Sequence, residues 1–126
     1  MSRGELRRNP LHVLIAGGSF QGKSLVALEV AHRLRVPLII CTDTVRNVLR
    51  VMQPRNEVYS TSTYLMNPSA LAAQCEAVSD VILGITRILQ DRGERAVFEG
   101  MHFSESLLRE LASRQNFRMV CLDNLY

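Results

Sequence analysis

The chain has 126 residues, of which 47% are hydrophobic and 21% charged, and it carries a formal net charge of +3 at pH 7. This length predicts one domain that can bury a core without disulfides or a metal, and the lack of any apolar run of about 18 residues excludes a membrane-spanning helix. The arginines are scattered outside a short cluster within residues 3–8, and no RNA-binding signature is present, so the basic charge does not favour nucleic-acid binding.

The three cysteines, Cys41, Cys75 and Cys121, are widely spaced and show no metal-ligand pattern. We interpret them as buried free thiols of a protein from a reducing compartment. Residues 1–10 are charged and hold no apolar run that would serve as a signal peptide, so we expect a basic leader there. The expectation is a soluble, cytoplasmic protein with a single domain over residues 11–126.

In chain order, the first expected element is a strand over residues 11–17, whose continuous apolar run is typical of a strand buried on both faces. A helix is predicted from Lys23 to about Leu34. Its apolar face is expected to consist of Leu25, Leu28, Ala31 and Leu34. A second buried strand is predicted over residues 36–41, and Thr42 or Asp43 is expected to cap the next helix. The apolar face of that helix is expected to consist of Val45, Val48, Leu49 and Met52.

Residues 53–67 are polar and lack a steady period, so we expect a loop with one helical turn at most. The clearest helix follows, with Asn67 as its cap, Pro68 at its first position and Gly93 beyond its last turn. Its apolar side is expected to consist of Leu71, Cys75, Val78, Ile82, Ile85 and Leu89. Strands are predicted over residues 95–100 and 117–122, separated by a short helix from Ser104 to about Ser113. This alternation predicts an α/β fold with a parallel sheet flanked by helices.

Residues 17–24, GGSFQGKS, satisfy the Walker A pattern G-x-x-x-x-G-K-[ST] between a predicted strand and a predicted helix, the context that this P-loop motif requires. Lys23 is the only lysine, whereas the other fourteen cationic residues are arginines. A lysine is a compact point charge on a thin stem, which suits a place between phosphate oxygens. Gly17 and Gly22 would let backbone N–H groups converge on an anion at the start of the helix.

The motif therefore predicts a phosphate-binding loop in which Lys23 reaches the β- and γ-phosphates and the Ser24 hydroxyl ligates Mg²⁺. The alternative is a glycine-rich turn with an exposed lysine. Phe20 is bulky where P-loops often place glycine, which predicts a different loop shape or packing toward the nucleotide. The residues assigned to nucleotide binding are Gly17, Gly18, Ser19, Phe20, Gln21, Gly22, Lys23, Ser24 and Leu25.

Ligands of open α/β sheets bind at the carboxyl edge, so polar residues that follow the other predicted strands are candidates for the same site. CTDTVR places Asp43 and Arg46 just past the second strand, and VFEGMH places Glu99 and His102 at the end of the third. YSTSTY forms a hydroxyl-rich loop between them. Its candidate residues are Thr61, Thr63 and Tyr64.

The ordered set GGSFQGKS, TDTVRNVLR, STSTYL and FEGMHF resembles the 2-phosphoglycerate kinases, P-loop small-molecule kinases related more distantly to shikimate kinases, gluconate kinases and zeta toxins. The resemblance covers most of residues 11–122. It implies a three-layer P-loop NTPase fold over residues 11–126, with ATP and Mg²⁺ as cofactors. The implied activity is transfer of the γ-phosphoryl group to a hydroxyl of a small anionic metabolite. Such kinases also carry a later arginine-bearing lid, so we expect a fold that lacks the C-terminal lid and last strand.

The resemblance also implies roles at the strand ends, with Lys23, Asp43, Arg46 and Glu99 as the catalytic set. Asp43 would orient the acceptor hydroxyl or accept its proton, or would instead serve as a helix cap paired with Arg46. Arg46 would hold an anionic substrate. Glu99 would hold the Mg²⁺ shell through water, or would be a buried structural carboxylate. The implied substrate contacts are Asp43, Arg46, Thr61, Thr63, Tyr64 and His102.

Some of these residues have simpler interpretations. His102 is also interpretable as a hydrogen-bonded histidine at a strand end, and the hydroxyl loop as an ordinary polar surface. Two other functions remain open for the chain: a non-catalytic nucleotide-binding module or kinase fragment that needs a further polypeptide, and a zeta-toxin-like kinase that acts on a sugar nucleotide. Free strand edges of an incomplete sheet would also permit self-association.

Overall fold

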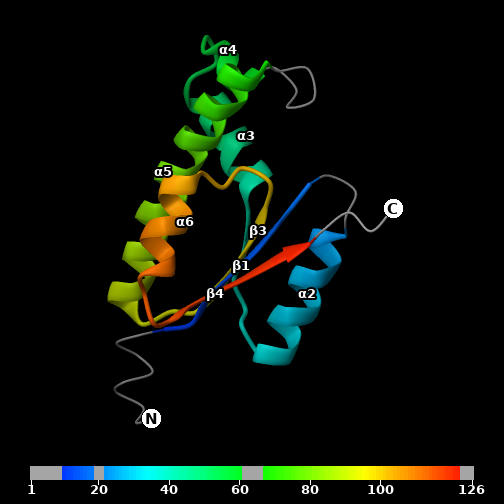
Figure 1. Cartoon of the computed structure of the whole chain (residues 1–126), viewed down its shortest axis with the longest axis vertical. Coiled ribbons are helices and arrows are strands. Elements are labelled where there is room, and N and C mark those ends of the chain that lie inside the picture. The colour runs from blue at the N-terminus through cyan, green and yellow to red at the C-terminus, as the bar shows by residue number, and fades with distance from the viewer. Residues whose placement is uncertain (1–9, 19–21, 61–66, 123–126) are drawn as a thin grey trace.

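The computed structural model describes residues 10–18, 22–60 and 67–122 (Figure 1). Strands and helices alternate along the described chain, as the sequence predicts. The elements are β1 (His12–Gly17), α2 (Lys23–Leu34), β2 (Ile39–Cys41), α3 (Thr42–Met52), α4 (Glu57–Ser60), α5 (Pro68–Arg92), β3 (Ala96–Gly100), α6 (Glu105–Ala112) and β4 (Phe117–Leu122).

The four strands form one parallel sheet in the order β2-β3-β1-β4. Helix α2 covers one face of this sheet, and α3, α5 and α6 cover the other (Figure 1). Alternate residues of the central strands enter the two cores, so that Leu14 and Phe98 face α5 and α6 while Val13, Ile15 and Val97 face α2. The predicted three-layer α/β fold is therefore confirmed.

Three of the predicted helix ends are confirmed by their capping contacts. The Asn67 side chain accepts a hydrogen bond from the Ala70 amide at 2.8 Å, and Gly93 ends α5 with a φ of 68°. Ser104 caps α6 by accepting from the Leu107 amide at 3.2 Å.

The cap predicted for α3 is wrong. The helix begins at Thr42, the N-cap position is Cys41, and no side chain there makes a capping hydrogen bond. Thr42 and Asp43 both lie inside the first turn. Their side chains make contacts other than caps, which belong to the candidate site.

The predicted apolar faces of the two N-terminal helices are only partly correct. On α2 the buried residues are Ala27 and Ala31, whereas Leu25 is 73% exposed and Leu28 is 57% exposed. On α3, Val45 is buried, but Val48 and Met52 are exposed. A strict spacing of three residues drifts around a helix of 3.6 residues per turn, and the small alanines of α2 are the residues that face the sheet.

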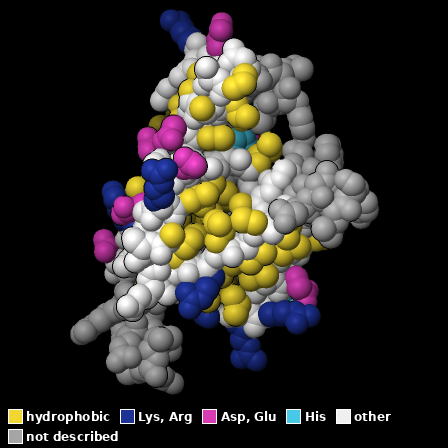
Figure 2. Space-filling view, in the orientation of Figure 1, with side chains coloured by type: hydrophobic (Ala, Val, Ile, Leu, Met, Phe, Trp, Pro, Cys, Tyr) yellow, Lys and Arg dark blue, Asp and Glu magenta, His cyan; other side chains and the backbone are white. Residues whose placement is uncertain are grey.

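Strand β4 forms one edge of the sheet, and its middle residues, from Arg118 to Cys121, are exposed. A groove of about 540 Å³ lies between this strand and α6, lined by Leu108, Phe117 and Met119 among others. Figure 2 shows hydrophobic side chains gathered on this face around β4. Since parallel strands are normally buried on both faces, β4 is the part of the described sheet that departs most from the usual pattern.

The three cysteines are free, as predicted, but they are not buried: Cys41 and Cys75 are half-buried and Cys121 is exposed. Among the helices that the structure describes, none is long and apolar enough to cross a bilayer.

A buried histidine at the start of β1 makes the stability dependent on pH. His12 is 1% exposed and donates from Nε2 to the carbonyl of Glu94 at 3.1 Å. Burial lowers its pKa below the ordinary 6.5, the hydrogen bond to Glu94 partly opposes this, and the charge of Arg114 lowers the pKa further. The folded state therefore resists a proton that the unfolded chain accepts.

We predict that the free energy of unfolding falls as the pH falls below about 6.5, because the unfolded chain then binds more protons than the folded chain. Urea unfolding at several pH values between 7.5 and 5 would measure this dependence. His12→Leu should lose part of the slope. An unchanged slope in this variant would show that His12 is not one of the responsible groups.

Candidate active site

The candidate site lies where the chain leaves β1 and β3 in different directions. The connection after β1 leads to α2 on one face of the sheet, and the connection after β3 leads to α6 on the other. The two strands are neighbours in register, with Ala16 beside Gly100. Divergent connections at adjacent carboxyl ends create the crevice in which α/β proteins bind their ligands.

The described parts of the glycine-rich turn lie at this crevice. Gly17 ends β1, and Gly22 precedes α2 with a φ of 74°, in the left-handed region that favours glycine. The first turn of α2 contains no acidic residue, so its partial positive charge is not offset there. Ser19, Phe20 and Gln21 lie outside the described residues, so their predicted contacts with a nucleotide stay predictions. Leu25 is exposed on α2, and its predicted nucleotide contact also stays a prediction.

Lys23 is the first residue of α2 and reaches back across the turn. Its Nζ donates a hydrogen bond to the carbonyl oxygen of Gly18 at 2.5 Å. The charged amine therefore lies next to the glycine-rich turn, where the predicted phosphates would bind. A phosphate oxygen offers the same amine a negatively charged acceptor, which makes a stronger hydrogen bond than a carbonyl.

Glu99 is the buried carboxylate of the site. It is 5% exposed, and Ser24 Oγ lies 3.5 Å from its Oε1. Cys41, its neighbour across β2 and β3, also hydrogen-bonds to it; burial and this bond raise the pKa of the Cys41 thiol, which therefore stays protonated and donates. The Ser24–Glu99 separation exceeds the usual 2.7–2.8 Å or so for a hydroxyl donor, so the two oxygens are adjacent without being tightly joined.

The oxygens of Ser24 and Glu99 are of the type that Mg²⁺ prefers. In the part of the chain that the structure describes, no group of three or more His, Cys, Asp or Glu residues could hold a metal ion. This donor set does not make a protein cage. It fits a magnesium ion that takes most of its ligands from phosphates and water, which is how Mg²⁺ is commonly bound.

Asp43 and Arg46 form an ion pair on the first turn of α3, with Arg46 Nη2 3.0 Å from Asp43 Oδ1. The Asp43 side chain is 58% exposed, whereas that of Arg46 is 18% exposed. Arg46 Nε is buried and has no hydrogen-bond partner among the described residues. The pairing left open by the sequence is confirmed, and the arginine keeps an unused donor that suits an anion.

His102 lies near Asp43, Arg46 and Lys23 and is buried. It is 1% exposed, and its Nδ1 is 2.9 Å from the hydroxyl of Thr42, which is 0% exposed. Burial lowers the pKa of His102; the charge of Arg46 lowers it further, Asp43 partly opposes this, and Lys23 also lowers it. The structure thus confirms a hydrogen-bonded histidine close to the strand end, while a substrate contact stays a prediction.

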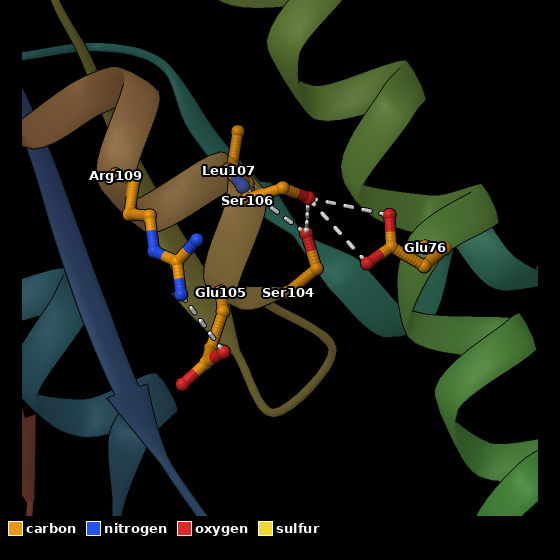
Figure 3. A network of polar contacts seen from close by, with 6 residues as sticks. All are labelled: Glu76, Ser104, Glu105, Ser106, Leu107 and Arg109. Atoms are coloured by element: carbon orange, nitrogen blue, oxygen red, sulfur yellow. Dashed lines mark hydrogen bonds and ion pairs between the residues drawn. The ribbon is translucent and has the colours of Figure 1, made fainter.

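The segment that carries His102 is anchored at its far end by a polar network on α6 (Figure 3). Ser104 Oγ lies 3.1 Å from Ser106 Oγ, which contacts the Glu76 carboxylate of α5 at 3.3 Å. The Ser104 amide also donates to Ser79 Oγ at 2.8 Å. The connection between β3 and α6 is therefore tied to α5 at several points.

The structure brings together Lys23, Ser24, Asp43, Arg46, Glu99 and His102 at one edge of the sheet. Thr61, Thr63 and Tyr64 lie outside the described residues, so their predicted contacts stay predictions. Sequence reasoning assigned no site role to two further residues, Cys41 and Thr42. The signal that could have indicated Thr42 is a polar residue directly after the strand predicted over residues 36–41.

No protein-family model matches the chain. Ten curated proteins match the chain at a significant level. The 2-phosphoglycerate kinase of Methanothermobacter thermautotrophicus is 30% identical over 91% of this chain and 43% of its own length. That of Pyrococcus horikoshii is 36% identical over 74% of this chain and 36% of its own. That of Methanocaldococcus jannaschii is 29% identical, with shares of 83% and 38%.

The fold is α/β, with a four-stranded parallel sheet flanked by helices, and the curated proteins that the chain matches bear the name 2-phosphoglycerate kinase. The resemblance to the 2-phosphoglycerate kinases is confirmed over most of this chain. The chain spans about 40% of the length of the curated relatives it matches, from 36% to 43% in the three described above.

The close approach of β3 to α3 gives a prediction for Gly100. A Cβ there would lie 1.8 Å from Thr42 Oγ1, so Gly100→Ala should displace Thr42 and lower the free energy of unfolding by about 1–3 kcal/mol. Gly84 of α5 is the matched control, because a Cβ there meets nothing within 4 Å. Gly84→Ala should stabilise the helix by roughly 0.5–1 kcal/mol. Urea unfolding of both variants measures the contrast, and equal effects would contradict the packing argument.

Proposed function

We propose that this chain carries the ATP-binding and acceptor-side parts of a Mg²⁺-dependent kinase, which transfers the γ-phosphoryl group of ATP to a hydroxyl of a small anionic metabolite. The observation that carries the proposal is the 3.5 Å approach of Ser24 Oγ to Glu99 Oε1, which places the residue after the Gly-Lys pair next to the acid at the end of β3. The relatives bear the name 2-phosphoglycerate kinase, so 2-phosphoglycerate is the first acceptor to test.

On the phosphate side, the chain supplies a positive end of a helix and one lysine. The amides at the start of α2 and the Lys23 amine would surround the β- and γ-phosphates. Positive charge placed there stabilises the negative charge that spreads over the transferring group. Bound Mg²⁺ would neutralise phosphate charge, with Ser24 as a ligand and Glu99 orienting its water shell.

On the acceptor side, the chain supplies the Asp43–Arg46 pair. The exposed Asp43 carboxylate would accept a hydrogen bond from the acceptor hydroxyl and orient it, or take its proton. The unused Nε donor and the guanidinium charge of Arg46 would hold an anionic group of the same metabolite. Catalysis in such a site is mainly positioning and charge stabilisation.

A second candidate function, a nucleotide-binding part that needs a further polypeptide for turnover, is favoured by a different observation. Strand β4 is exposed along its middle, and the relatives are more than twice as long as the part matched here. Other segments of such kinases can contribute arginines that raise the rate by several orders of magnitude. Binding and turnover therefore need separate measurements.

Lys23→Ala tests the phosphate side. We predict that MgATP binds to the unmodified chain and that the variant binds at least about tenfold more weakly, since a charge-assisted hydrogen bond is lost. Isothermal titration calorimetry measures both affinities. Arg33→Ala is the matched control, because Arg33 is an exposed cation on the same helix, paired with Glu29 on the surface. Equal affinities for MgATP in all three proteins would contradict the proposed site.

The release of ADP in the presence and absence of 2-phosphoglycerate separates the two candidate functions. Release that depends on this acceptor supports the kinase. Binding of MgATP without such release supports the nucleotide-binding part, whereas release that depends instead on a sugar nucleotide would support a zeta-toxin-like activity.

A further inference from the structure

Two buried polar side chains, His102 and Thr42, connect the two halves of the candidate site. His102 follows β3, whose Glu99 belongs to the phosphate side, and Thr42 opens α3, which carries the acceptor side. Their 2.9 Å hydrogen bond is fully enclosed. A buried polar pair is costly if either partner is lost, so this contact fixes the relative position of the elements that it joins.

His102 is held by its backbone as well as by its ring. Ser79 of α5 donates its hydroxyl to the carbonyl of His102 at 3.0 Å and accepts from the Ser104 amide at 2.8 Å. The segment between β3 and α6 is thereby attached to the longest helix of the fold. The imidazole thus extends from a fixed backbone.

Thr42 is the first residue of α3 and is enclosed from a second side by the backbone of Gly100, where a Cβ would lie 1.8 Å from its hydroxyl. The helix has no side-chain cap, so its first turn lacks the stabilisation that a cap provides. The contacts of Thr42 with His102 and Gly100 hold that turn in place. Asp43 is the next residue, and Arg46 follows one turn later.

We propose that His102 is a positioning residue for the acceptor, which acts through its hydrogen bond to Thr42 and sets the place of the Asp43–Arg46 pair relative to Glu99. This inference rests on the proposed kinase function. The role differs from that of a general base, because Nδ1 is already bonded to Thr42 and the side chain is buried.

The charged groups around His102 are consistent with a neutral ring. Arg46 and Asp43 face it from α3, and Lys23 acts on it from α2. A neutral imidazole fixes Thr42 without adding a third positive charge near Lys23 and Arg46. The two cations then remain available for the anionic groups of the nucleotide and the acceptor.

Substitutions of Thr42 test the proposal without removing the histidine. Thr42→Ser keeps the hydroxyl, whereas Thr42→Val keeps the shape and loses it. We expect Thr42→Val to lower kcat/KM for 2-phosphoglycerate by about 10- to 100-fold, because a displacement near 1 Å has effects of this size. The Kd for MgATP should change by less than about threefold. Thr42→Ser should retain most of the activity.

The matched control is His12→Leu, which removes the other buried histidine from the far end of β1. It should lower the melting temperature without a selective effect on the acceptor. If Thr42→Val proves unstable, His102→Leu gives a second variant that also loses the hydrogen bond to Thr42, and it should show the same selective loss for the acceptor. Equal effects of Thr42→Val on the acceptor and on MgATP, or equal losses in Thr42→Val and Thr42→Ser, would overturn the positioning role.

A measurement without turnover separates this inference from the proposed function. The chain has three histidines, so ¹⁵N spectra of labelled histidine can follow His102 directly. Thr42→Val should shift the Nδ1 signal of His102 and leave those of His12 unchanged. Addition of 2-phosphoglycerate should shift the His102 signal in the unmodified chain and require a higher concentration in Thr42→Val.

The combined results distinguish failure of the proposed kinase function from failure of the positioning role of His102. A chain that binds no MgATP and releases no ADP would refute the proposed function, whatever the spectra show. A working kinase in which Thr42→Val leaves the His102 signal or the acceptor kinetics unchanged would refute the positioning role alone. A coupled change in both supports the proposal.

Discussion

The candidate site depends on the close contact between the end of β3 and the start of α3. Gly100 leaves no space for a side chain, so its backbone lies directly against the Thr42 hydroxyl and methyl groups. This contact brings the acid at the end of one strand next to the helix that follows its neighbour. If the two elements were separated by one more carbon atom, Asp43 and Arg46 would move away from Glu99 as a unit, because they share a helix with Thr42.

The sequence predicted the order and type of the elements well, because each has a strong local signal. The continuous apolar runs of β1 and β3 indicate buried parallel strands, and Asn67, Pro68 and Gly93 mark both ends of α5. The faces of α2 and α3 were harder to predict. Leu25 and Met52 are apolar but exposed, and a residue pattern alone does not show which side of a helix meets the sheet.

The sequence was sufficient to predict which strand ends carry the candidate site. It was not sufficient to predict which side chains contact one another there. Glu99 and Asp43 could be placed because parallel strands share a carboxyl edge. The bond between Thr42 and His102 joins residues 60 positions apart, and Ser24 and Glu99 are separated by 75 positions. No local pattern encodes such pairs. The incorrect cap on α3 has the same origin, since the Thr42 hydroxyl bonds to a distant histidine and not to its own helix.

The distribution of charge in the site follows from its geometry. Lys23 and Arg46 are both cationic and both close enough to His102 to lower its pKa, yet each has an oxygen partner: the carbonyl of Gly18 for Lys23 and the carboxylate of Asp43 for Arg46. The lysine partner is neutral, so in the proposed kinase a phosphate would replace it at little electrostatic cost. The arginine partner is anionic, so in the proposed kinase the Asp43–Arg46 pair would be kept and the remaining donors of Arg46 would hold a second anion. One lysine and one arginine therefore suit two anionic ligands that must lie side by side without sharing a cation.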